Sequence, residues 1–271
     1  MGMYRIGIVV LALVLLPQYA AASDSAVPAS RDSISSTLQS APPRSANAPQ
    51  ADAATGDKRA DFAREPASRD ARHIADWVVD SGDNRSLPFV IIDKTEARIF
   101  VFDASGRIRG AAPALLGIAR GDDTVPGIGK RELSKIRPEE RTTPAGRFVA
   151  ERGMSIRGKN TEDILWVDYD SALSLHRVIN SNPRDRRLER LATPTPADNR
   201  ISYGCINVPA AFYNEVVNPS FTGTRGIVYV LPETRPVRQV FGSYDVEVRN
   251  QTVVQAPRNT TLAGALPTTT Q

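Results

Sequence analysis

The sequence FVIIDKTEARIFVF, from Phe89 to Phe102, sets the predicted fold. Its first part, residues 89–92, is a continuous apolar run, and residues 93–96 form a polar turn. In the second part, Ile99 and Val101 share one face of an extended chain, because side chains alternate along a strand. Two such runs joined by a short polar turn predict a pair of antiparallel strands.

The segments around this pair predict a mainly β fold with short helices. A turn at residues 103–106 leads into a third strand over 107–117, and residues 68–80 have the apolar spacing of an amphipathic helix. The polar stretch 119–143 is predicted to be a long surface loop. A second polar stretch, Asn180 to Arg200, is predicted as a charged helix or loop, or alternatively as a flap that contacts carboxylates. Further strands are expected at 147–151, 164–167, 172–176 and 226–231, and a helix at 208–217.

The N-terminal residues predict export. Arg5 precedes an apolar run from Ile6 to Leu16, Pro17 ends the run, and small residues lead up to Ala22. This run is shorter than the ~20 residues that span a bilayer, so cleavage near Ala22 is favoured over an uncleaved anchor. We therefore expect a protein of the periplasm or cell envelope. The predicted ranges are 1–22 signal peptide, 23–67 disordered Ala/Ser/Pro-rich tether, 68–86 N-terminal helix, 87–234 main folded domain and 235–271 C-terminal tail.

Charge and composition narrow the classes of partner. The net charge is +4, and basic residues are interleaved with acidic ones. Aromatic and basic residues do not alternate as they do in a strand-binding groove, so we expect no nucleic-acid partner. A wall polymer that carries carboxylates fits the charge better. Neither a metal nor an organic cofactor is expected, since one cysteine and two histidines are too few for a zinc cage.

Cys205 is the only cysteine, and it is a candidate nucleophile. It cannot form an internal disulfide, and an unpaired thiol in an exported protein indicates reactivity rather than the alternative, an inert buried thiol. Gly204 allows a sharp turn before it, and Asn207 is predicted to cap a following helix whose positive end favours a thiolate. His176, at the end of a predicted strand, is the candidate base. His73 is expected to be structural.

The motif from Ser202 to Asn207, SYGCIN, with His176 upstream, resembles the L,D-transpeptidase catalytic domain (the YkuD family). Residues 89–94 resemble the opening strand of that family, and Thr143 to Phe148, TPAGRF, resembles its T-P-x-G-x-F turn. The resemblance covers about residues 88–232. It implies a β-sandwich with Cys205 as nucleophile, His176 as base, and Ser202, Tyr203 and Gly204 lining the site. Tyr203 stands where the family usually has histidine, and a phenol is not a base near neutral pH.

The resemblance also implies a substrate and a reaction. The family cuts after the third residue of a tetrapeptide stem of peptidoglycan, forms a thioester on cysteine, and passes the acyl group to an amine of a second stem, which makes a 3-3 crosslink. Water as acceptor would make the protein a hydrolase, and a protein lysine would make it an anchoring enzyme with an envelope protein as partner. A wall-binding module without catalysis is a further alternative. A papain-like protease is disfavoured, because there the nucleophile precedes its histidine. The sequence does not indicate the oligomeric state.

Overall fold

The predicted antiparallel pair is present in the computed structural model, which describes residues 58–157 and 160–255. β1 (Phe89–Asp93) pairs with β2 (Arg98–Phe102), and Phe89 lies opposite Phe102. Every residue of β1 is buried. Both faces of this strand are therefore covered, which explains its continuous apolar run.

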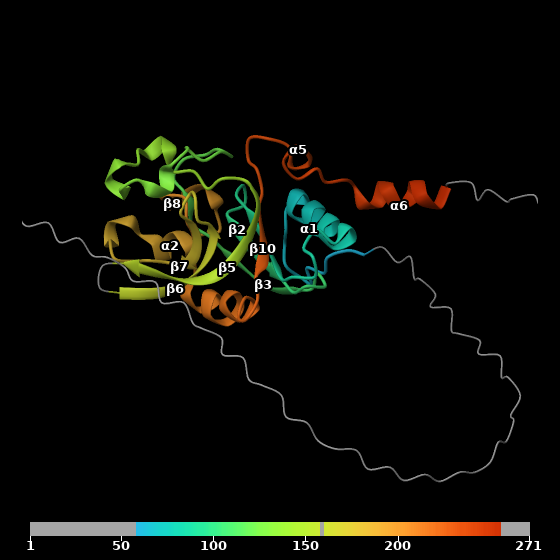
Figure 1. Cartoon of the computed structure of the whole chain (residues 1–271), viewed down its shortest axis with the longest axis horizontal. Coiled ribbons are helices and arrows are strands. Elements are labelled where there is room, and N and C mark those ends of the chain that lie inside the picture. Colours follow the sequence, from blue (N-terminus) through green and yellow to red (C-terminus); the bar gives the residue numbers. More distant parts are fainter. Residues whose placement is uncertain (1–57, 158–159, 256–271) are drawn as a thin grey trace, which may run out of the picture. The chain divides into compact units, whose positions relative to one another are not determined.

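One eight-stranded sheet forms the centre of the fold, in the order β3-β2-β1-β10-β5-β6-β7-β9, and several of its strands are labelled in Figure 1. β1 pairs parallel with β10 (Gly226–Val230), and β10 pairs antiparallel with β5 (Gly146–Arg157). The predicted mainly β class is confirmed. The other strands of this sheet are β3 (Ile108–Pro113), β6 (Asn160–Asp168), β7 (Leu173–Arg177) and β9 (Ile206–Val208). β4 (Leu116–Gly117) and β8 (Arg200–Ser202) form a small parallel pair.

The sheet curls around one apolar core and presents its other face to a second. Val90 and Val228 from the middle of the sheet pack in the same cluster as Leu175 and Ile206 from its far end. The middle of the sheet therefore faces its β7–β9 end across this core, as in a sandwich. On the opposite face, Phe89 and its neighbours pack against α1 (Arg69–Ser81).

Capping residues define both ends of helix α1. The Ser68 hydroxyl accepts a hydrogen bond from the Ala71 N–H at 3.1 Å, as an N-cap does. Gly82 follows the last turn with φ +69°, a conformation that glycine adopts without strain. α1 lies within residues 68–86, and its buried side is made by Ile74, Trp77 and Val78 together with two alanines.

Both ends of the described chain join the fold more closely than predicted. Residues 58–67 were assigned to the disordered tether, but Phe62 is only 4% exposed and contacts the rings of Phe100 and Phe102 edge-on. Residues 235–255 were assigned to the tail, but they contain α5 (Val237–Phe241) and α6 (Val246–Gln255). A few apolar side chains in a polar segment were sufficient to dock it on the second core. The predicted signal peptide, residues 23–57 of the tether and residues 256–271 lie outside the described residues.

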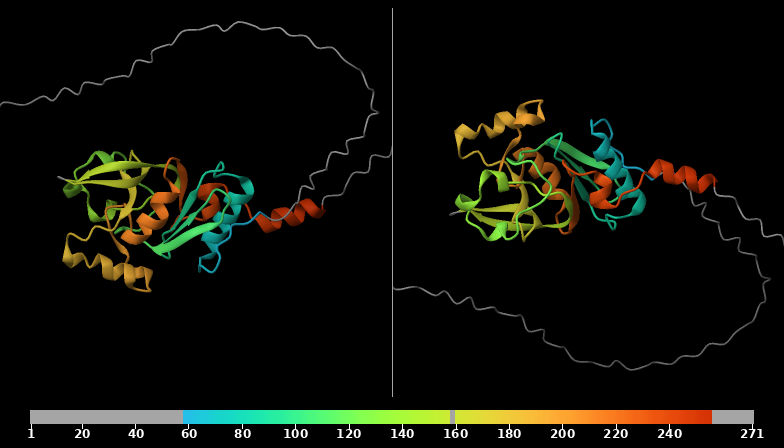
Figure 2. Two further views of the ribbon diagram at one scale, coloured as in Figure 1. Left: turned by 90° about the horizontal axis from the view of Figure 1, so that it is seen from below. Right: turned by 90° about the horizontal axis from the view of Figure 1, so that it is seen from above.

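The long polar segments are ordered as short helical turns. Residues 119–143 form the predicted loop, which contains η1 (Ile128–Lys130), η2 (Leu133–Lys135) and η3 (Pro138–Glu140). The stretch 180–200 contains η4 (Pro183–Asp185), α2 (Arg187–Ala192) and η5 (Pro196–Asp198). Both segments lie at the end of the molecule away from α1 (Figure 2).

A helical segment after the cysteine runs through α3 (Ala210–Phe212), a π-helical turn (Tyr213–Val217) and α4 (Asn218–Ser220).

In residues 58–157 and 160–255, no helix has both the length and the apolar character that crossing a membrane requires.

Candidate functional site

Cys205 lies on the sheet face opposite the first core. Leu175 of β7 pairs with Ile206 of β9, and both side chains belong to that core. Because side chains alternate, Ser174, His176 and Cys205 lie on the other face. The Ser174 hydroxyl donates to the Cys205 Sγ at 3.4 Å, and the thiol donates to the carbonyl of Ala172 at 3.5 Å. Of the two predicted reactive residues, His176 lies on β7 and Cys205 directly precedes β9, the neighbouring strand.

The His176 ring is held in a single orientation. It is only 4% exposed, and its Nδ1 lies 2.7 Å from the carbonyl oxygen of Arg177. A carbonyl can only accept, so Nδ1 carries the proton and Nε2 is the basic nitrogen. This tautomer is the one that a general base needs.

The turn before Cys205 requires both Ser202 and Gly204. The Ser202 hydroxyl donates to the Cys205 carbonyl at 2.7 Å and accepts from the Gly204 N–H at 3.1 Å. Gly204 has φ +127°, and a Cβ on it would lie 2.7 Å from the Thr142 carbonyl oxygen. No other residue fits this position without displacing the Thr142 backbone. The Thr143 hydroxyl holds the turn from the other side by donating to the Gly204 carbonyl at 2.7 Å.

Asn207 does not cap a helix, and that prediction was wrong. It lies within β9, opposite His176 in the parallel ladder, and the next helix begins after Pro209. Its amide instead donates to the Cys205 carbonyl at 3.1 Å and accepts from Arg187 at 3.1 Å. Because a strand separates the thiol from that helix, the helix dipole gives no stabilisation of a thiolate at Cys205.

Tyr203 contacts its surroundings through its ring. The guanidinium of Arg141 lies 3.8 Å from the ring centroid, and Arg141 is itself held by two hydrogen bonds to the Ile136 carbonyl. Tyr203 is 37% exposed and lines the same small pocket as Cys205 and Gly204. That pocket has a volume of about 20 Å³, which is room for about one water molecule. The pocket is lined by Tyr203, by residues of the loop over 119–143 and by residues 171–173.

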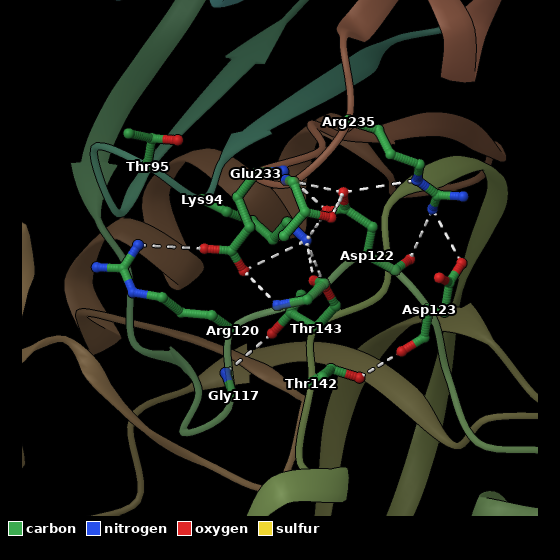
Figure 3. Close-up of polar contacts among 12 residues, drawn as sticks. Lys94, Thr95, Gly117, Arg120, Asp122, Asp123, Thr142, Thr143, Glu233 and Arg235 are labelled. Atoms are coloured by element: carbon green, nitrogen blue, oxygen red, sulfur yellow. Dashed lines mark hydrogen bonds and ion pairs between the residues drawn. The ribbon is translucent and has the colours of Figure 1, made fainter.

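The loop is anchored by a buried lysine that the sequence did not identify (Figure 3). Lys94 Nζ, at the end of β1, donates to Asp122 at 2.8 Å, to the Gly121 carbonyl at 2.6 Å and to the Thr143 carbonyl at 3.0 Å. Burial lowers the pKa of Lys94, and the carboxylates of Asp122 and Glu233 offset part of that effect. Lys94 thus connects, through Thr143, to the turn that carries Cys205. The only sequence signal for it was a charged residue directly after an apolar strand.

Burial opposes ionisation of Asp122, yet its pKa lies well below the ordinary value. Hydrogen bonds from Lys94 and from the Thr234 hydroxyl, together with the backbone N–H groups of Glu233 and Thr234, outweigh the effect of burial. Asp122 therefore fixes the start of the loop to the segment after β10.

The stretch 180–200 contains short charged helical turns, in line with the prediction of a charged helix or loop. Arg187 donates to Asp185 at 2.9 Å and to Asn207 at 3.1 Å, and Arg190 donates to two backbone carbonyls of the same stretch. This segment meets the candidate site at Asn207.

His73 lies apart from the candidate site and is hydrogen-bonded to Ser243 at 2.9 Å. No group of His, Cys, Asp and Glu in the described part of the chain could hold a metal ion.

Comparison with solved structures finds L,D-transpeptidases. The chain is similar to an L,D-transpeptidase from Xylanimonas cellulosilytica (18% identity, TM-score 0.34) and to the Ldtfm-avibactam carbamoyl enzyme (14%, 0.31). It covers 60% and 49% of those chains, which align with 53% and 54% of this one. The catalytic domain of the E. faecium L,D-transpeptidase is 15% identical with a TM-score of 0.29, and 96% of it aligns with 53% of this chain. No protein-family model and no curated protein matches the sequence. At these identities and TM-scores, the likeness assigns neither the site residues nor the reaction.

Proposed function

We propose that the protein is an exported cysteine L,D-transpeptidase that acts on the tetrapeptide stems of peptidoglycan and forms 3-3 crosslinks. One observation carries the proposal. Cys205 Sγ contacts Ser174 of β7 at 3.4 Å, and the same face of that strand presents His176, whose Nδ1 is fixed by the Arg177 carbonyl at 2.7 Å. A thiol and an oriented imidazole that share one face of a sheet suit the roles of a nucleophile and its general base.

The reaction follows from these groups. His176 Nε2 takes the proton of the Cys205 thiol, and the thiolate attacks the carbonyl carbon of the third stem residue. The bond to the terminal D-alanine breaks, and its nitrogen takes the proton from His176, leaving a thioester. An amine of a second stem then attacks, loses its proton to His176, and releases the cysteine as the new amide forms. Tyr203 and Gly204 line this site, and the buried Ser202 hydroxyl holds their turn through its bonds to the Cys205 carbonyl and the Gly204 N–H.

Access to the thiol requires part of the structure to move. The pocket at Cys205 has a volume of about 20 Å³, so it holds about one water molecule and no peptide. We expect a bound stem to displace residues that line this pocket, from the loop over 119–143, from residues 171–173 or at Tyr203. The signal peptide that the sequence predicts supports a reaction in the periplasm or cell envelope, where peptidoglycan lies.

Acylation by a carbapenem tests the nucleophile, because the family that the sequence resembles is sensitive to these compounds. Intact mass spectrometry should show one adduct on the wild-type protein and none on Cys205→Ala. His176→Ala should slow adduct formation by at least ~100-fold, the usual scale of general base catalysis. The matched control is His73→Ala, which should acylate normally. Equal effects of the two histidine variants would exclude His176 as the base.

Product analysis separates the acceptors. The protein is incubated with purified peptidoglycan, and the resulting muropeptides are mapped. New 3-3 crosslinks support transfer to a stem, whereas shortened stems alone indicate transfer to water. Wild-type protein that binds sacculi without ever forming an acyl adduct would be a wall-binding module.

A further inference from the structure

A pair of stacked aromatic rings lies on the same sheet face as Cys205. Trp166 of β6 and Tyr169 just after it have ring centroids 4.9 Å apart and an interplanar angle of 28°. Beneath them lies Gly153 of β5, where a Cβ would come within 2.6 Å of the Trp166 ring. Trp166 thus packs closely against a strand position that has no side chain. Tyr169 is 58% exposed and forms the outer layer of this platform.

The register of the sheet places the platform in line with the thiol. Trp166 lies opposite Glu151 of β5 on one side and opposite Ser174 of β7 on the other. Ser174 in turn contacts Cys205 Sγ at 3.4 Å. Residues directly opposite each other share a face, so Trp166, Ser174 and Cys205 form a row across the sheet. The two ends of this row are two strand spacings apart, a distance of about 10 Å.

The platform combines a flat apolar face with polar groups at its edge. The Tyr169 hydroxyl donates to one oxygen of Glu151 at 3.3 Å, and the other oxygen accepts from Arg225 at 3.0 Å. Glu151 is part-exposed and retains acceptor capacity, since a carboxylate has about four acceptor sites. A ligand that fits must place C–H groups on the ring and hydroxyl or amide groups around it. A pyranose sugar has both, and so does an N-acetylated amino sugar.

We propose that Trp166 and Tyr169 form a subsite for a sugar ring of the glycan strand whose stem is attacked by Cys205. This subsite rests on the proposed function for its substrate. Three stem residues separate the sugar from the carbonyl under attack, and three extended residues span at most about 10–11 Å. This reach matches the row from Cys205 to Trp166. Tyr169 then binds the sugar while the third residue reaches the thiol.

The direct test compares binding with and without the sugar. Full-length Cys205→Ala protein is titrated calorimetrically with a disaccharide-tetrapeptide and with the same tetrapeptide lacking sugar. We expect the disaccharide to tighten binding several-fold. Adding Tyr169→Ala should abolish that gain while leaving the Kd of the sugar-free peptide unchanged. Tyr169→Phe, which keeps the ring and loses only the bond to Glu151, should retain most of the gain. A Tyr169→Ala variant that keeps the full gain, or that weakens both ligands equally, overturns the proposal.

A second measurement separates this proposal from the catalytic one. Trp166 is one of two tryptophans in the chain, and the other, Trp77, is 7% exposed and packs edge-on against Tyr229. A chitooligosaccharide should therefore change tryptophan emission in the wild type and not in Tyr169→Ala. A sugar response without carbapenem acylation would support the subsite and overturn the catalytic proposal. Normal acylation without a sugar response would overturn the subsite alone.

Discussion

At the scale of single residues, the position of the thiol depends on Gly204. The residue combines a positive φ with a backbone contact, and each of these disfavours a side chain for a separate reason. Ser202 and Thr143 bond to the same turn from two sides. A change at residue 204 is therefore transmitted directly to the Cys205 backbone.

Gly204→Ala should largely abolish acylation of Cys205. The new Cβ would lie 2.7 Å from the Thr142 carbonyl oxygen at φ +127°, so the turn must move, and we expect a loss of stability of about 1–3 kcal/mol. The rate of carbapenem adduct formation and a denaturant titration measure the two effects. Gly223→Ala is the matched control, because Gly223 also has a positive φ, +73°, but a Cβ there would meet nothing within 4 Å. If both variants acylate alike, the contact with Thr142 is unimportant.

Tyr203→Phe should leave the acylation rate within about two-fold of the wild type. The contact that fixes Tyr203 is the one between its ring and Arg141 at 3.8 Å, and a phenyl ring preserves it. Tyr203→Ala removes that contact, worth about 0.5–1 kcal/mol at an exposed site, and should change the rate more. Pre-steady-state adduct formation distinguishes the variants. A large loss in Tyr203→Phe would show that the hydroxyl takes part in the proton transfers.

At the scale of elements, the sequence predicted the strands whose neighbours lie close along the chain. Residues 89–102 have both apolar runs and the turn between them, so local pattern is sufficient. β5 and β6 extend well beyond the predicted 147–151 and 164–167. Arg152, opposite Leu165, and Asp163, opposite Met154, join the ladder although they interrupt the apolar pattern from which the strands were predicted. Asn207 was misassigned for a related reason. Its local preference for a helix cap is outweighed by ladder pairing with His176. His176 lies far from Asn207 along the chain, so the residues around Asn207 do not predict this pairing.

Ser68→Ala should destabilise the protein by about 1–2 kcal/mol through α1, since loss of an N-cap alone costs about 1 kcal/mol. The Ser68 hydroxyl accepts from the Ala71 N–H at 3.1 Å and donates to Asp93 at 2.5 Å, so it joins the helix to the end of β1. Urea denaturation measures the change. Ser68→Thr keeps the hydroxyl and should recover most of the stability. Equal losses in both variants would mean that the capping bond contributes little.

At the scale of the whole molecule, buried charges join segments that are distant in sequence. Lys94, Asp122 and Glu233 have side chains that are at most 3% exposed, and Arg200 pairs with Glu233 at 2.6 Å. Together they connect the end of β1, the start of the loop over 119–143, β8 and the segment after β10. No local pattern predicts such a network, because in the sequence each member resembles an ordinary surface charge. The same holds for residues 58–67 and 235–255, whose few apolar side chains find partners only in the folded chain.

The network should make stability depend on acid through Asp122. Its pKa in the folded protein lies below its ordinary value of 3.8, so the unfolded chain binds a proton at a pH where the folded protein does not. The stability that it supplies is fully present above the unfolded value and is lost as the pH falls through 3.8 towards the folded value. Each such proton contributes a slope of up to about 1.4 kcal/mol per pH unit.

Asp122→Asn should therefore lower the free energy of unfolding at pH 7 by about 3–5 kcal/mol, because it leaves the buried Lys94 charge short of a partner. It should also flatten the decline of stability in acid, since the titrating carboxyl is gone. Urea titrations at a series of pH values from neutral to acid measure both effects. Asp123→Asn is the matched control, since that side chain is 82% exposed and pairs with Arg235 at the surface. Its free energy of unfolding should decline in acid as steeply as that of the wild type. If Asp122→Asn retains the wild-type slope in acid, the carboxylate is not the group that couples this network to pH.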